Sequence, residues 1–129
     1  MNGSYRLSSG ALVVFGTAFL LVYPLMLLWR SGWTWQPRQL EYEQMMVGIY
    51  GTLGIFLLWA SRRPQAHPSL IWFTVWASGV HGGIMAVQAL VDPAEHAHLP
   101  GDVLALLLVA GVLGLLTPRG VTSAAPAAA

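Results

Sequence analysis

The chain has 129 residues, of which 56% are hydrophobic and 9% are charged, and its formal net charge at pH 7 is +1. This composition lies outside the range of ordinary soluble domains and indicates a membrane protein. A net charge so close to zero gives no reason to expect a nucleic-acid partner. The absence of cysteine excludes disulfides, thiolate metal sites and cysteine nucleophiles. No phosphate-binding loop or catalytic motif is present, so the sequence predicts no catalytic residue.

Four segments are close to the length of about 20 mostly apolar residues that a membrane-crossing helix needs. The predicted spans are 10–29, 42–60, 69–90 and 102–117. Pro24 predicts a kink in the outer third of the first span, because proline removes one backbone hydrogen bond. We therefore expect an all-α fold, an integral membrane four-helix bundle that forms a single transmembrane domain over residues 1–129 and ends in a disordered tail at 118–129.

The positions of the arginines predict the orientation, because Lys and Arg concentrate in cytoplasmic connections. One side of the predicted bundle carries four arginines and the other side carries two. The first group is Arg6, Arg62, Arg63 and Arg119, and the second is Arg30 and Arg38. Both termini should therefore be cytoplasmic. All five acidic residues then fall on the outer side.

His81 lies near the middle of the third predicted span, where an ionisable side chain is costly unless it has a polar partner. Helix residues three and four positions apart share a face. That spacing predicts a polar and thioether stripe facing the bundle interior, made of Thr74, Ser78, His81, Met85 and Gln88. The stripe marks either a functional site or interhelical hydrogen bonds without chemistry.

The second span supplies the expected partner, because the short proline-containing connection at 62–68 makes the second and third spans antiparallel neighbours. Glu43 and Tyr50 are seven residues apart, as are His81 and Gln88. The matching separations predict that Tyr50 faces His81, and that Glu43 or Gln44 faces Gln88. The predicted intramembrane cluster comprises Glu43, Gln44, Tyr50, Ser78, His81, Met85 and Gln88.

Such a cluster could hold a proton path, a quinone headgroup, a haem or a metal, and the sequence favours no cofactor among them. A haem with two axial histidines needs a second histidine at depth, but His67, His96 and His98 all fall in connections. A single haem held by His81 from two copies of the chain stays open. In the outer connection, Glu95, His96 and His98 form a weak metal-binding candidate, for which a solvated loop is the simpler interpretation. Asp102 is expected to be the N-cap of the fourth span.

Glycines in three of the spans predict close helix packing, which drives association inside membranes. These are Gly48, Gly51, Gly54, Gly79, Gly82, Gly83, Gly111 and Gly114. Four short helices enclose little volume. We therefore expect a homo-oligomer or a larger membrane complex to cover part of the surface, and the bilayer to cover the rest.

Three stretches of the sequence resemble an uncharacterised family of small bacterial four-span membrane proteins. They are EYEQMMVGIY at 41–50, FTVW at 73–76 and VHGGIMAVQA at 80–89. The resemblance implies a multi-pass helical bundle in the bacterial inner (plasma) membrane. It implies no activity.

Two classes of function remain open, and whether the protein is an enzyme is left undecided. The first is a non-catalytic accessory or assembly subunit of a larger membrane complex, favoured by the small size and the glycine-rich helices. The second is a protein that binds quinone, haem or metal through Glu43, Tyr50, His81 and Gln88. We expect the first, because a single deep histidine lacks the second deep ligand that most cofactors require.

Overall fold

The computed structural model describes residues 3–34 and 39–119, and all regular secondary structure in them is helical. The main helices are α1 (Gly3–Leu20), α2 (Val22–Leu28), α3 (Arg30–Trp33), α4 (Leu40–Ala60), α5 (Pro68–Val91) and α6 (Leu104–Leu116). Short turns connect them: η1 (Pro64–Ala66), η2 (Pro93–His98) and η3 (Leu99–Val103). Arg38 and most of the predicted tail, residues 120–129, lie outside the described part of the chain.

The described helices include three that are long and apolar enough to cross a membrane, at Leu40–Ala60, Pro68–Val91 and Pro93–Leu116. A fourth span results if α1 and α2 are taken together. The last candidate span begins nine residues before the predicted 102, because it includes the short helical turns η2 and η3, which are kinked at Gly101. The first begins at Gly3 instead of residue 10.

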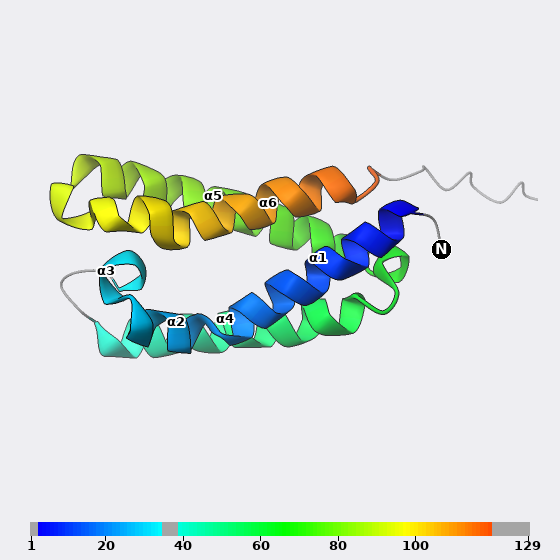
Figure 1. The fold of residues 1–129 in the computed structure, drawn as a ribbon, viewed down its shortest axis with the longest axis horizontal. Helices are drawn as coiled ribbons and strands as arrows, with labels where there is room; N and C mark the ends of the chain where they lie inside the picture. Colours follow the sequence, from blue (N-terminus) through cyan, green and yellow to red (C-terminus); the bar gives the residue numbers. More distant parts are fainter. Residues whose placement is uncertain (1–2, 35–38, 120–129) are drawn as a thin grey trace, which may run out of the picture.

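The first span bends by 58° between α1 and α2. Leu21 is the break between the two helices, three residues before Pro24. Pro24 has no backbone N–H to donate to the carbonyl of Leu20, four residues earlier, which explains the predicted kink at this point. Beyond α2 the chain turns into α3, which lies between the two layers of the fold (Figure 1).

The long helices form two layers (Figure 1). In one layer α1 and α2 pack against α4, and in the other α5 packs against α6; α1 also contacts α6. The second and third predicted spans, α4 and α5, meet through the side chains of Tyr50 and His81, but they make little backbone contact and each packs more closely against another helix. A glycine pair explains the preference of α4 for α1: a Cβ on Gly54 would lie 2.6 Å from the carbonyl oxygen of Gly16, and one on Gly16 would lie 2.9 Å from that of Gly54.

The half of the bundle nearest the first and last described residues is tightly packed, and we call it the closed half. Leu12, Leu57, Ile71 and Leu113 come from all four long helices and are almost completely buried there. The hydroxyl of Ser8 donates a hydrogen bond of 2.8 Å to the carbonyl of Leu116, which joins the start of α1 to the end of α6. The two described ends of the chain therefore lie side by side (Figure 1).

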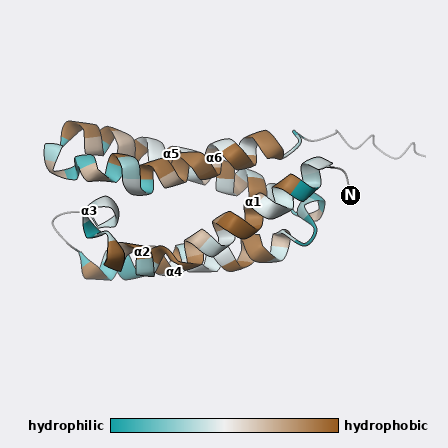
Figure 2. Cartoon of the chain, in the orientation of Figure 1, coloured by the Kyte–Doolittle hydropathy of each residue, from teal (hydrophilic) through white to brown (hydrophobic). Residues whose placement is uncertain are grey.

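In the other half, the hollow half, the two layers are held apart by α3 (Figure 1). Gly101 in η3 lies so close to Gly32 in α3 that no side chain would fit between them. Hydrophilic residues gather at the two ends of the molecule, and hydrophobic ones occupy the helix surfaces between them (Figure 2). Large apolar side chains such as Ile49, Trp76 and Leu115 are exposed on those surfaces, a pattern compatible with a membrane protein.

Candidate ligand cavity

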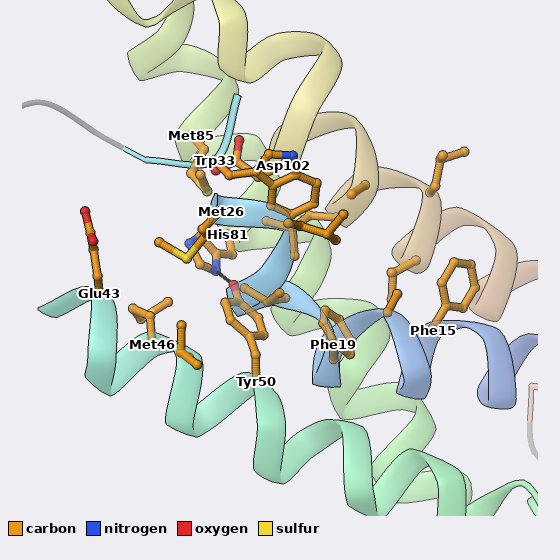
Figure 3. A pocket seen from close by; sticks show the side chains of 18 of the residues that line it. Phe15, Phe19, Met26, Trp33, Glu43, Met46, Tyr50, His81, Met85 and Asp102 are labelled. Carbon is orange, nitrogen blue, oxygen red and sulfur yellow. Dashed lines mark hydrogen bonds between the residues drawn. The ribbon is translucent and has the colours of Figure 1, made fainter. Parts of the chain in front are cut away.

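A cavity of about 670 Å³ lies between the two layers in the hollow half (Figure 3). It exists because α3 separates the layers and because α4 and α5 do not pack tightly against each other. Residues of α1, α2, α3, α4, α5, η3 and α6 line it. The closed half of the bundle, packed around Leu12 and Leu113, lies beyond its inner end.

Tyr50 of α4 and His81 of α5 meet across the cavity (Figure 3). The hydroxyl of Tyr50 and Nδ1 of His81 form a hydrogen bond of 2.5 Å, the contact that the sequence predicts. The second ring nitrogen of His81, Nε2, has no hydrogen-bond partner in the described residues. When the ring carries its proton on Nε2, Tyr50 donates to Nδ1, and Nε2–H is left as a donor for another molecule.

Ring stacking among side chains of three helices fixes the orientation of Tyr50 and His81. The ring centroids of Phe19 and Tyr50 are 5.2 Å apart with an interplanar angle of 13°. Those of Tyr50 and His81 are 5.9 Å apart, with an angle of 10°. Near-parallel rings at these separations stabilise one another. The side chain of His81 is therefore held by stacking as well as by its hydrogen bond.

Three further residues of the predicted cluster line the cavity, and two do not. Glu43, Met85 and Gln88 lie on its walls with Tyr50 and His81. Gln44 is exposed on α4, and Ser78 is buried in α5 away from the cavity lining. Glu43 lies seven residues before Tyr50, and Gln88 lies seven residues after His81. This spacing therefore correctly predicts that Glu43 and Gln88 share the cavity with Tyr50 and His81.

Asp102 lines the cavity too, and sequence reasoning missed it as a site residue. The prediction that it caps the fourth span is wrong, because α6 begins at Leu104 without a side-chain cap. Its carboxylate instead accepts a hydrogen bond of 2.9 Å from Nδ1 of His98. No helical spacing reveals this pairing, because Gly101 between the two residues has a non-helical backbone.

His98 is fully buried at the outer end of the cavity, contrary to the interpretation of its segment as a solvated loop. Its Nε2 lies 3.0 Å from a carboxylate oxygen of Glu95 and 3.3 Å from the carbonyl oxygen of Thr34. His96, the third residue of the predicted metal candidate, is exposed. In the described part of the chain, no group of three or more His, Asp and Glu residues is arranged to hold a metal ion.

The eight glycines singled out in the sequence divide into two groups. A Cβ on Gly54, Gly79, Gly82 or Gly114 would contact a neighbouring helix. A Cβ on Gly48, Gly51, Gly83 or Gly111 would meet no atom within 4 Å. The first group packs within the bundle, and the second lies where there is open space.

The family model described as "Family of unknown function (DUF6632)" matches residues 2–128 of the chain. No curated protein and no solved structure matches the chain.

Proposed function

We propose that this chain, which belongs to the DUF6632 family of unknown function, is a membrane protein that holds one lipid-soluble small molecule between its two helical layers. The cavity at Tyr50 and His81 is the observation that carries the proposal. Its volume of about 670 Å³ falls in the range of roughly 300–1,000 Å³ that is usual for small-molecule sites. Its apolar walls and few convergent polar groups also match such sites.

Residence in the membrane is supported by the three or four apolar helices and by the apolar surfaces between the hydrophilic ends. The four arginines at the closed end favour a cytoplasmic position for that end. The resemblance of residues 41–50, 73–76 and 80–89 to small bacterial membrane proteins supports the bacterial inner membrane as the location.

The chemistry of the lining favours a neutral headgroup such as a quinone ring. Nε2 of His81 can donate to a ring carbonyl, as it has no partner in the described residues. The described lining contains no arginine, and the chain contains no lysine, so this lining offers no cation to a phosphate or carboxylate. A charged headgroup would be costly to bury without such a counter-charge.

Haem and metal ions fit the described residues less well. His81 is the single histidine in the described cavity lining, so one copy does not supply two axial histidines. The described residues also hold no group of metal ligands. Quinone is therefore the class of ligand that we propose out of the three that the sequence left open.

A second candidate function is that of a non-catalytic accessory subunit in a homo-oligomer or a larger membrane complex. Gly48 and Gly51 of α4, Gly83 of α5 and Gly111 of α6 favour it, because each has open space where a Cβ would point. Glycines on an outer helix surface allow another helix to approach closely.

Two variants, each with one histidine replaced, test the ligand proposal. We expect purified wild-type protein to bind a ubiquinone analogue with a ten-carbon chain, measured by tryptophan fluorescence, and His81→Phe to bind it at least tenfold more weakly. The substitution keeps an aromatic ring beside Tyr50 but removes both nitrogens. A tenfold loss corresponds to about 1.4 kcal/mol, the scale of one hydrogen bond.

His67→Phe is the matched control, because His67 lies in the connection before α5 and contacts Trp59 instead of the cavity. It should bind the quinone like the wild type. Equal binding by His81→Phe and the wild type would contradict the proposal. The accessory-subunit function would be supported instead if the wild type and His81→Phe both bound no quinone and both co-purified with the same partner at a fixed stoichiometry.

A further inference from the structure

Polar and apolar residues lie on different sides of the cavity. The polar side chains that α4 and α5 contribute to the lining are Tyr42, Glu43, Tyr50, His81 and Gln88. Every lining residue contributed by α1, α2 and α6 is apolar. Asp102 of η3 and Gln39 before α4 add further polar groups to the lining. A molecule with one polar end and one apolar end would match this arrangement.

The apolar side of the cavity opens sideways between α1 and α6. Val14 and Leu108 line the cavity from these two helices, yet they are 63% and 50% exposed. Ala18 lines the same side, is exposed, and has too small a side chain to close the space. These residues form the rim of an opening that faces outward at the level of the apolar helix surfaces.

The opposite side of the cavity, between α4 and α5, is also open, because Tyr42 and Gln88 line it there and are exposed. The rim on that side is polar, and the space between the helices is obstructed at the depth of His81. There the hydrogen bond and the ring stacking between Tyr50 and His81 connect the two helices (Figure 3). The inner end is blocked by the buried side chains of the closed half, such as Leu12 and Leu57. The opening between α1 and α6 is therefore the apolar way out.

We propose that the ligand is a long-chain lipid with a neutral headgroup, and that its hydrocarbon chain leaves the cavity between α1 and α6 into the bilayer. This inference rests on the proposed function. The headgroup lies against His81, and the first carbons of the chain pass Ala18, Val14 and Leu108. Carbons beyond this rim remain among the lipids, so the size of the cavity does not limit the length of the chain.

Ala18→Phe tests the route, because it adds a ring at the rim without changing a polar group. The probes are ubiquinone with a ten-carbon chain and the same ring without a chain, each titrated into protein in lipid nanodiscs and quantified by its mole fraction in the bilayer. We expect Ala18→Phe to weaken binding of the chain-bearing probe at least tenfold and to leave binding of the bare ring within threefold of the wild type. Thr17→Phe is the matched control, since Thr17 is exposed on α1 and does not line the cavity.

Photo-crosslinking of the wild-type protein gives a second readout that does not depend on the fold of a variant. A ubiquinone analogue with a diazirine in its chain should label peptides from α1 and α6. Labelling of α4 and α5 instead would overturn the proposed route of the chain. The route would also be overturned if Ala18→Phe weakened the binding of both probes equally, or of neither. Failure of both probes to bind the wild type would overturn the proposed function itself, which distinguishes the two ideas.

Discussion

At the scale of single residues, His98 joins η2 and η3 to the distant end of α3, at the end of the cavity far from the closed half. Its ring lies between carboxylates of η2 and η3, Glu95 and Asp102, and it also faces the carbonyl of Thr34 after α3. Nδ1 of His98 lies 2.9 Å from the carboxylate of Asp102, so the two side chains form a direct hydrogen bond. His98 thereby fixes Asp102 in the cavity wall.

Removal of this ring should destabilise the protein strongly. His98→Ala removes the hydrogen-bonding partner that Asp102 and Glu95 share, and loss of one partner of a buried hydrogen bond typically costs about 1–3 kcal/mol. We expect a clear loss of thermal stability in detergent, followed by intrinsic fluorescence. His96→Ala, two residues earlier and exposed, should change the stability by less than about 0.5 kcal/mol. Equal stability of the two variants would show that the buried cluster does not hold the outer end together.

Sequence patterns predicted one of the two polar contacts of the site and missed the other. Tyr50 and His81 were paired because both lie in long helices, where a seven-residue separation translates directly into depth and face. His98 and Asp102 lie in η2 and η3, and Gly101 between them has a non-helical backbone. No helical periodicity applies there, so the burial of these side chains depends on the tertiary contacts of η2 and η3 with α3 and α5.

At the scale of the helices, the sequence predicted where α4 and α5 lie but not what they pack against. The predicted spans 42–60 and 69–90 differ from the observed α4 and α5 by at most two residues at either end. A short connection makes consecutive helices antiparallel, but it does not determine which other helix each one contacts most closely. The decisive contact is between Gly16 and Gly54, and Gly16 was not among the glycines singled out.

A methyl group at this crossing should separate α1 from α4. Gly54→Ala places a Cβ against the carbonyl of Gly16, and overpacking of this kind typically costs about 1–3 kcal/mol. Gly51→Ala, one turn earlier on α4, meets no atom within 4 Å and should be neutral or slightly stabilising, because alanine favours helices over glycine by about 1 kcal/mol. Thermal unfolding of both variants in the same detergent measures the difference. A Gly54→Ala protein as stable as Gly51→Ala would mean that the two helices are not in such close contact.

At the scale of the whole molecule, the described ends of the chain and the connection at η1 lie at one end, and η2 and η3 lie at the other (Figure 1). Arg6, Arg62, Arg63 and Arg119 are all exposed. They lie close to the described ends and to η1, which is the end of the molecule that the sequence assigns to the cytoplasm. The side of the membrane on which each end lies remains a prediction from the arginines.

Single cysteines test this orientation cleanly, because the chain has none of its own. Gln65→Cys in η1 and His96→Cys in η2 replace exposed side chains at opposite ends. In intact bacterial cells, a membrane-impermeant maleimide should label His96→Cys and should label Gln65→Cys only after the membrane is opened. The reverse pattern would invert the orientation, and equal labelling of both in intact cells would indicate insertion in two directions.

The tight packing of the closed half has a further consequence for transport. The side chains of Leu12, Leu57, Ile71 and Leu113 leave no continuation of the cavity toward the arginine-rich end. A lipid held as proposed enters and leaves by the same lateral opening, so binding produces no net flux between the two leaflets. The occupancy of the cavity would then follow how much of that lipid the surrounding bilayer contains.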